Sequence, residues 1–218
     1  LAHVPILAHG QVNNVLIIGG GDGGALREVL RHGEIACATM VEIDENVVEL
    51  CKEYLPGISG GSFEDPRTNL VIGDGSSYVA NSTDTYDLII IDSTDPIGPG
   101  ETLFTEEFYR NCHSRLKGKG ILVNQNGVPF TQEKELCSSS QRLRRVFKDA
   151  TIYLTVVPTY IGGYMALGWA SDFEAHRFIT LENLEARYRD LNLITRYYSP
   201  NIHTASFVLP PFITEMIT

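Results

Sequence analysis

The sequence lacks several features that identify common protein classes. Lys and Arg total 17 residues against 27 Asp and Glu, which gives a net charge of −10 at pH 7. No basic run is present to bind phosphates, so the sequence predicts no nucleic-acid partner. The apolar runs are far shorter than the ~18 residues of a membrane span, which predicts no membrane partner. A net negative surface favours small cationic ligands instead.

Cysteine and histidine patterns are also sparse. The four cysteines are Cys37, Cys51, Cys112 and Cys137. They form no C-x-x-C pair, which is typical of reduced thiols in a cytoplasmic protein. No two of the six histidines have metal-ligand spacing, so we expect no metal site. The chain begins with Leu and shows no signal-peptide pattern. We expect residues 1–14 to be the remnant of a preceding region, and residues 15–218 to form one catalytic domain.

Short apolar runs alternate with amphipathic segments along most of the chain. Strands are predicted at 15–20, 39–44, 69–75, 86–92, 120–126, 151–160 and 164–171. Helices are predicted at 24–32, 45–55, 105–116, 131–147 and 180–191, and an extended segment at 203–210. This alternation predicts an α/β fold with a doubly wound, mainly parallel sheet that ends in a hairpin-like edge.

Acidic residues follow four of the predicted strands. They are Asp22, Glu42, Asp74 and Asp92. Ligands of doubly wound sheets bind beyond the carboxyl ends of the strands, so we expect these acids on one rim. A fifth acid, Asp95, lies in the stretch DSTDPIGPG at 92–100. Two neighbouring carboxylates resist ionising together, which raises the pKa of one and makes it a better base. The alternative is an ordinary Asp-Pro turn.

The segment IGGGDGG at 18–24 contains the pattern G-x-G-x-x-G between a strand and a helix. With Glu42 about 20 residues further on, this pattern permits NAD binding. Asp22 argues against a pyrophosphate, because it places a carboxylate inside the loop that would hold the anion. It favours a cationic group near the loop, or it caps the following helix. Glu42 suits the ribose of NAD and of adenosyl ligands equally. Asp74 is either an adenine contact or part of a common Asp-Gly turn.

The stretches GGGDGG and DSTDPIGP, together with VPTYIGGYMALGWAS and NIHTASFVLP, make the chain resemble the spermidine synthases, the bacterial polyamine aminopropyltransferases. The matching stretches lie in order along nearly the whole chain. The resemblance implies a class I methyltransferase-like Rossmann fold preceded by a small N-terminal β-domain. The family's substrate contacts from that β-domain have no counterpart in this sequence.

The resemblance also implies an activity, which is transfer of an aminopropyl group from decarboxylated S-adenosylmethionine to putrescine. The products would be spermidine and methylthioadenosine, with no cofactor besides the co-substrate, and the family's dimers imply a homodimer. Asp92 would accept a proton. The implied putrescine site is Asp92, Ser93, Thr94, Asp95 and Tyr160. The implied donor site is Gly19, Gly21, Asp22, Glu42, Asp74, Gly75 and Pro99.

Other functions remain open at this point. The first is a related aminopropyltransferase with another amine as acceptor, or a putrescine N-methyltransferase that uses S-adenosylmethionine. Asp22 disfavours the methyl donor, because that donor keeps its carboxylate. The second is an NAD-dependent oxidoreductase. The third is a shortened, non-catalytic chain that binds a nucleoside or a polyamine.

Overall fold

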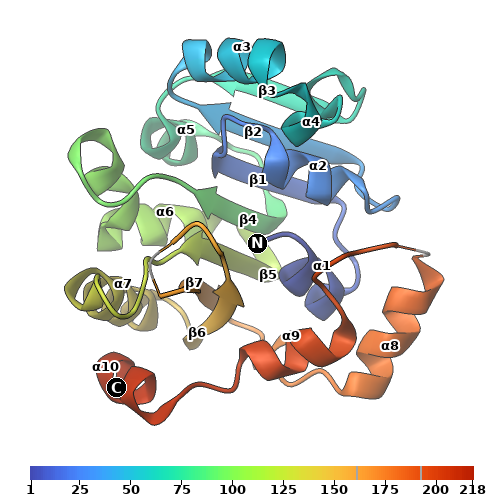
Figure 1. The fold of residues 1–218 in the computed structure, drawn as a ribbon. Coiled ribbons are helices and arrows are strands. Elements are labelled where there is room, and N and C mark those ends of the chain that lie inside the picture. Colours follow the sequence, from blue (N-terminus) through green and yellow to red (C-terminus); the bar gives the residue numbers. More distant parts are fainter. Residues whose placement is uncertain (161, 192) are drawn as a thin grey trace.

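Seven strands form one sheet in the computed structural model, in the order β3-β2-β1-β4-β5-β7-β6 (Figure 1). The structure describes residues 1–160, 162–191 and 193–218. The strands are β1 (Asn14–Gly19), β2 (Cys37–Glu42), β3 (Thr68–Ile72), β4 (Tyr86–Asp92), β5 (Leu116–Gln125), β6 (Asp149–Val156) and β7 (Tyr164–Ser171). The five strands β3, β2, β1, β4 and β5 pair in parallel with their neighbours in this order. Strand β7 pairs antiparallel with both β5 and β6. The doubly wound, mainly parallel sheet and its edge hairpin are therefore confirmed.

Two hydrophobic cores lie on opposite faces of this sheet. Successive side chains of a strand point to opposite faces, so Val15 and Ile17 of β1 join one core while Leu16 and Ile18 join the other. The helices that cover the first face are α1 (His3–His9) and α2 (Gly24–Leu30). The helices that cover the second are α5 (Gly75–Asn81), α6 (Glu106–Arg115) and α7 (Glu133–Val146). Burial on both faces explains the uninterrupted apolar runs.

Side-chain caps fix where several helices begin. Thr105 accepts a hydrogen bond from the N–H of Phe108 (3.1 Å) and so caps α6. Asp74 caps α5, a helix that the sequence did not predict, through the N–H of Ser77 (2.6 Å). The remaining helical elements before β6 are α3 (Glu45–Tyr54), α4 (Pro56–Ser59), η1 (Ser62–Glu64) and η2 (Gly98–Phe104). Within the described ranges, no helix combines the length and the apolar character that crossing a bilayer requires.

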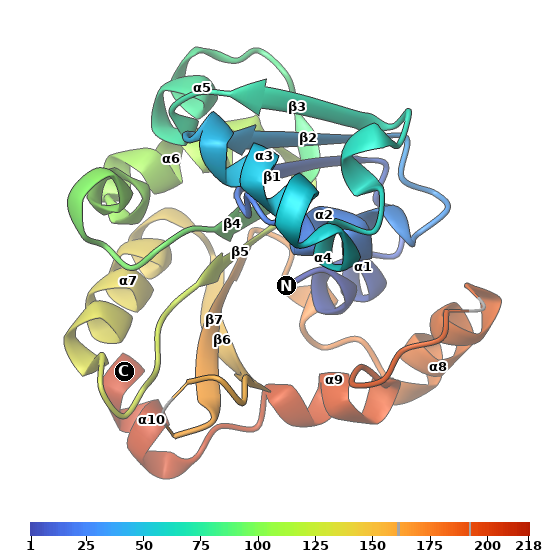
Figure 2. The same cartoon turned by 45° about the horizontal axis from the view of Figure 1, so that its top comes forward.

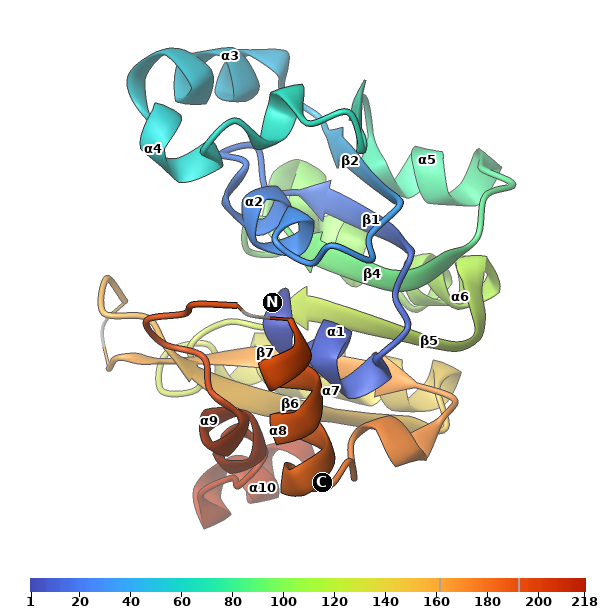
Figure 3. The ribbon, with the colours of Figure 1, turned by 90° about the vertical axis from the view of Figure 1, so that its right-hand side faces the viewer.

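The first residues of the chain pack on the sheet. Ile6 and Ala8 of α1 join the same core as Val15. Figure 3 shows α1 beside β5, and Figure 2 shows it next to α2, where His3 bonds to Glu28. The end of α1 is tied to α8 (Leu181–Asp190), because Arg187 donates hydrogen bonds to the carbonyls of Leu7 and Ala8. Residues 1–14 therefore contribute to the core of the domain that follows them.

The C-terminal residues form helices rather than an extended segment. The structure contains η3 (Glu174–His176), α9 (Pro200–Ser206) and α10 (Pro211–Ile217), so the prediction of extended chain at 203–210 is wrong over 203–206. The hydroxyl of Ser199 accepts a hydrogen bond from the N–H of Ile202 (3.2 Å), and Pro200 occupies the first helical position. Both features start a helix. After it, Phe207 packs on the rings of Tyr153 and Trp169.

Asp87 anchors the amino-terminal edge of the central strands, and its removal tests this part of the fold. Its Oδ2 accepts hydrogen bonds from the N–H groups of Asn13 (3.0 Å) and Asn14 (2.9 Å) and from Lys117 Nζ (2.9 Å). We expect Asp87→Ala to lower the free energy of unfolding by about 2 kcal/mol, because two backbone donors lose their acceptor. Denaturant unfolding measures the change, with the exposed Asp84→Ala as control. Equal unfolding midpoints for Asp87→Ala and wild type would contradict the assignment.

The same anchor predicts a pH dependence. Burial acts to raise the pKa of Asp87, but its N–H and Lys117 donors outweigh burial and hold the pKa below its ordinary value. The stabilisation is therefore present above the ordinary pKa of an aspartate and is lost as pH falls through the lowered pKa. The difference in stability between wild type and Asp87→Ala should shrink over that acidic range.

Candidate active site

A cleft of about 1010 Å³ lies at the carboxyl ends of the parallel strands. The strand register brings these ends together, since Gly19 of β1 pairs with Asp92 of β4 and Glu42 of β2 pairs with Ile72 of β3. Strands β1 and β4 are neighbours, and the chain continues outward from them in opposite directions, to β2 and to β5. Doubly wound sheets bind their ligands at such a switch point. The cleft therefore lies where the sequence predicts a site.

Every residue that the sequence singled out lines this cleft. They are Gly19, Gly21, Asp22, Glu42, Asp74, Gly75, Asp92, Ser93, Thr94, Asp95, Pro99 and Tyr160. Five of them carry carboxylates, whereas none of the described residues that line the cleft is Lys, Arg or His. A concave site with charges of one sign concentrates ligands of the opposite sign. The cleft is therefore suited to cations and poorly suited to a pyrophosphate.

The glycine-rich loop crosses directly over the end of β4. Gly19 has φ 81°, a conformation that favours glycine, and a Cβ at this position would collide with the carbonyl of Asp92. The N–H of Gly20 donates a hydrogen bond to the same carbonyl (2.8 Å). A Cβ at Gly20 would lie 3.3 Å from Asp92 Oδ2. The loop and the carboxylate of Asp92 are therefore held in fixed proximity.

Three of the five acids each accept one backbone hydrogen bond at the start of a helix. The bonds run from Gly24 N to Asp22 Oδ1 (2.8 Å), from Asp44 N to Glu42 Oε1 (3.1 Å) and from Ser77 N to Asp74 Oδ1 (2.6 Å). Asp22 therefore bonds the first N–H of α2, where Gly23 is the N-cap, and Asp74 is the N-cap of α5 rather than part of an Asp-Gly turn. The described residues give the second oxygen of each acid no hydrogen-bond donor. Among those same residues, no group of three or more His, Cys, Asp or Glu could hold a metal ion.

Asp92 has the electrostatic environment of a base. Burial raises the pKa of its carboxyl group above the ordinary value, and the carboxylates of Asp22 and Glu42 add to the rise. A raised pKa gives a carboxylate a stronger tendency to take a proton from a neighbouring group. Asp92 is therefore the described acid of the cleft best suited to accept a proton.

The loop after Asp92 holds the second acid of the pair. The N–H of Ile97 donates to the carbonyl of Asp95 (2.7 Å), which forms the expected turn. Gln125 Nε2 approaches Asp95 Oδ1 at 3.5 Å. Gln125 ends β5 and lines the cleft. The sequence interpretation missed it, although the rule applied to the other strand ends would have found it.

Several other lining residues of the cleft were not predicted. They come from the segment after β5, from the β6–β7 connection and from β7: Gly127, Val128, Thr131, Gln132, Thr159 and Met165. Gln132 Oε1 accepts a hydrogen bond from the N–H of Val128 (2.8 Å), which closes the segment after β5 into a compact loop. An apolar wall comes from Ile18, Val41, Ile43, Val47 and Leu103. No local pattern marks these positions, because only the sheet topology brings them to the cleft.

The electrostatic coupling of the acids can be tested without a ligand. We expect Asp22→Asn to lower the pKa of Asp92, because it removes a negative charge that disfavours ionisation. Carbon-13 NMR of labelled aspartate carboxyls, recorded as a function of pH, measures this pKa in the wild type and the variant. Asp84→Asn is a control with the same charge change at an exposed position. An Asp92 pKa that is equal in Asp22→Asn and wild type would rule out the coupling.

Known proteins are similar to this chain over nearly its whole length. Residues 1–179 match the family model described as the spermine/spermidine synthase domain. Over 216 residues the chain is 52% identical to a polyamine aminopropyltransferase of Ruegeria sp. (strain TM1040), covering 99% of this chain and 76% of that protein. It is also 52% identical over 217 residues to polyamine aminopropyltransferase 1 of Pseudomonas aeruginosa, covering 100% of this chain and 76% of that protein.

Solved structures give the same result. A spermidine synthase crystallised with the transition-state analogue AdoDATO is similar with a TM-score of 0.92 and 38% identity, over 99% of this chain and 73% of that chain. The spermidine synthase of Thermotoga maritima is similar with a TM-score of 0.88 and 36% identity, over 100% of this chain and 72% of that chain. The expected methyltransferase-like fold is therefore confirmed.

Proposed function

The chain belongs to the spermine/spermidine synthase family, and from this assignment we propose how its cleft carries out aminopropyl transfer. The protein is a transferase of the aminopropyltransferase class that makes spermidine. In our proposal the donor is decarboxylated S-adenosylmethionine, the acceptor is putrescine and the second product is methylthioadenosine. The observation that supports this pair of substrates best is the cleft itself, which has five carboxylates and no basic side chain among its described lining residues.

Asp22 selects the donor in this proposal. Decarboxylation leaves the tail of the donor with an ammonium group and no carboxylate, so the tail carries only positive charge. Asp22 is exposed to the cleft, and its second carboxylate oxygen has no described protein partner. It attracts the ammonium group and repels the carboxylate of ordinary S-adenosylmethionine, so one charge provides both affinity and exclusion.

Glu42 and Asp74 bind the nucleoside part of the donor. Glu42 is only 8% exposed, and one of its oxygens remains available for the two ribose hydroxyls. Asp74 lies at the end of the same rim and can accept a hydrogen bond from the adenine amino group. The apolar residues Ile43 and Val47, which line the cleft beside them, offer a surface for the flat base.

Asp92 and Asp95 interact with different ends of the diamine. With the pKa of lysine, ~10.4, as a guide, deprotonating one amine of putrescine at pH 7 costs roughly 4–5 kcal/mol. Asp92 offsets part of this cost by accepting the proton. Asp95, together with Gln125, holds the distant ammonium group and so orients the reacting nitrogen toward the donor. Such orientation of reacting groups is a large source of rate enhancement. The apposition of Gln125 and Asp95 supports this pairing.

The chemical step is one displacement. The nitrogen of putrescine attacks the aminopropyl carbon that is bonded to the sulfonium, a C–N bond forms and the C–S bond breaks. Its electron pair goes to sulfur, which becomes the neutral thioether of methylthioadenosine. The proton released from nitrogen goes to Asp92, so the step balances without an oxidant or reductant.

Two other expectations from the sequence remain predictions. A cytoplasmic location is in keeping with four cysteines that are all free thiols in the structure. A homodimer is implied only by the family resemblance, and sedimentation analysis of the chain would test it.

Asp92→Asn tests the assignment of the base. We expect a loss of turnover of at least ~100-fold, because general-base catalysis contributes about 10²–10⁴-fold, while affinity for decarboxylated S-adenosylmethionine changes little. Turnover of wild type with putrescine should rise with pH through the raised pKa of Asp92, since only the ionised carboxylate accepts a proton. Near wild-type turnover in Asp92→Asn, with Asp84→Asn as control, would remove Asp92 as the base.

Donor discrimination tests Asp22. Calorimetry should show tighter binding of decarboxylated than of ordinary S-adenosylmethionine to the wild type, and a much smaller difference in Asp22→Asn. NAD serves as a third ligand and should not bind, because the cleft offers its pyrophosphate no described basic side chain. Equal affinity of the wild type for the two sulfonium compounds would overturn the role of Asp22. Donor binding without any putrescine turnover would favour the non-catalytic alternative.

A further inference from the structure

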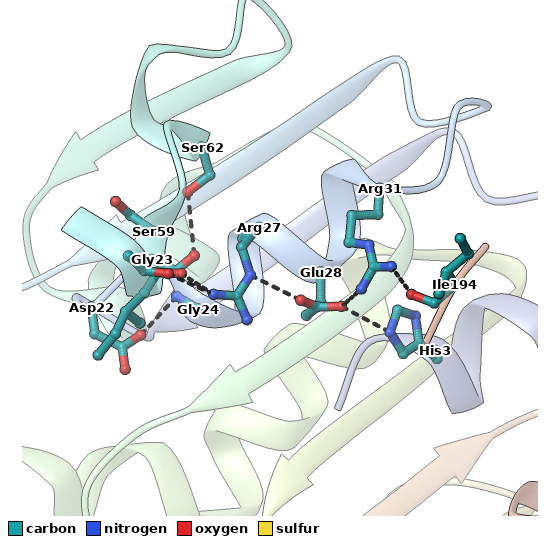
Figure 4. Close-up of polar contacts among 12 residues, drawn as sticks. His3, Asp22, Gly23, Gly24, Arg27, Glu28, Arg31, Ser59, Ser62 and Ile194 are labelled. Carbon is teal, nitrogen blue, oxygen red and sulfur yellow. Dashed lines mark hydrogen bonds and ion pairs between the residues drawn. The ribbon is translucent and has the colours of Figure 1, made fainter. Parts of the chain in front are cut away.

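A segment of the chain lies behind the glycine turn, residues 22–24 of the glycine-rich loop, and contacts it directly. This segment, residues 56–63, contains α4 and the start of η1 and is called the outer segment below. The hydroxyl of Ser62 donates a hydrogen bond to the carbonyl of Gly23 (3.2 Å), as Figure 4 shows. Gly23 has φ 75°, and a Cβ at this position would lie 2.8 Å from the ring of Phe63. The outer segment therefore leaves the turn no room to move away from the cleft.

Arg27 ties the outer segment to helix α2. Its Nη1 donates hydrogen bonds to the carbonyls of Gly57 (3.2 Å) and Ile58 (2.5 Å), while its Nε donates to Glu28 Oε1 (2.9 Å). These carbonyls belong to a helix of four residues, where intrahelical partners are lacking. The backbone N–H of Arg27 donates to the carbonyl of Gly23 (2.9 Å). One residue thus contacts both the turn and the segment behind it.

Asp22 depends on this turn for its direction. Its Oδ1 accepts a hydrogen bond from the N–H of Gly24 (2.8 Å), and among the described residues no Lys or Arg forms an ion pair with it. The second oxygen is therefore aimed into the cleft only by the backbone between Asp22 and Gly24. That backbone is what Arg27 and the outer segment hold.

We propose that Arg27 is a positioning residue for donor selection: it locks the outer segment against the glycine turn and so fixes the direction of the Asp22 carboxylate. The inference rests on the proposed function of Asp22. Exclusion of a donor carboxylate requires like charges to be held close together, whereas a mobile aspartate would turn away. Loss of the contacts between Arg27 and the outer segment therefore weakens discrimination between the two donors more than it weakens the binding of the nucleoside.

Arg31 provides a matched control. Its Nη1 donates to Glu28 Oε2 (2.7 Å), so Arg27 and Arg31 share one carboxylate, as Figure 4 shows. The other hydrogen bond of Arg31 goes to the carbonyl of Ile194, away from the glycine turn. Arg27→Met and Arg31→Met therefore remove the same charge and one ion pair with Glu28, but only the first releases the outer segment.

The experiment measures the ratio of the dissociation constants for ordinary and decarboxylated S-adenosylmethionine by calorimetry. We expect Arg27→Met to reduce this ratio by about tenfold, a size in keeping with small errors of placement. The KM for the decarboxylated donor should rise, while the KM for putrescine should change less than about twofold. Arg27→Lys should restore part of the ratio, because an ammonium group can donate to the same carbonyls. Arg31→Met should keep the ratio of the wild type.

Further measurements separate the possible failures. Amide hydrogen exchange at Gly24 reports the turn without any ligand and should accelerate in Arg27→Met but not in Arg31→Met. If Arg27→Met fails to fold, Ser62→Ala should show the same changes to a smaller degree. An unchanged ratio in Asp22→Asn would overturn the role of Asp22 itself. A ratio that collapses in Asp22→Asn but survives in Arg27→Met, or falls equally in Arg31→Met, would overturn the positioning role alone.

Discussion

The gathering of five carboxylates on one rim is the constraint on which the rest of the structure depends. In a parallel α/β sheet the carboxyl ends of strands and the amino ends of the following helices meet at the same edge. Helix amino ends carry partial positive charge and free N–H groups, so they usually attract anionic ligands. Here Asp22, Glu42 and Asp74 each take up one such N–H group. The protein's own carboxylates occupy places that a phosphate would otherwise use.

The presence of carboxylates where a phosphate would otherwise bind explains why a glycine-rich loop is compatible with cationic ligands. A backbone N–H donor stabilises a carboxylate by a dipole and leaves its full charge in place, whereas a Lys or Arg partner would neutralise it. The described lining of the cleft contains no such partner. Asp92 shows the electrostatic consequence, because its pKa is raised by burial and by the charges of Asp22 and Glu42. Bound cations relieve this repulsion, so the arrangement of these carboxylates suits ligands of positive charge.

The sequence was informative where the chemistry is local. The uninterrupted apolar runs of β1 and β4 mark where these strands end, and those ends fix where Asp22 and Asp92 lie. It was less informative where topology decides. Met165 reaches the cleft because β7 runs antiparallel beside β5, a pairing that no local pattern encodes. Helices α5 and α9 have seven residues each and few deeply buried positions, so their periodicity is weak, although their caps at Asp74 and Ser199 were present in the sequence.

The fixed negative charge of the cleft also affects how the products of the proposed reaction leave. The donor brings two positive charges, a sulfonium and an ammonium, and the thioether product keeps neither. The aminopropyl ammonium leaves with the polyamine, which becomes more cationic than putrescine. A cleft with fixed negative charge therefore loses its electrostatic hold on the nucleoside as the C–S bond breaks, and keeps that hold on spermidine until solvent and salt compete for it. Since Asp22 is held by a backbone contact rather than by a ligand, the charge that we propose selects the donor is available for the next molecule without rearrangement.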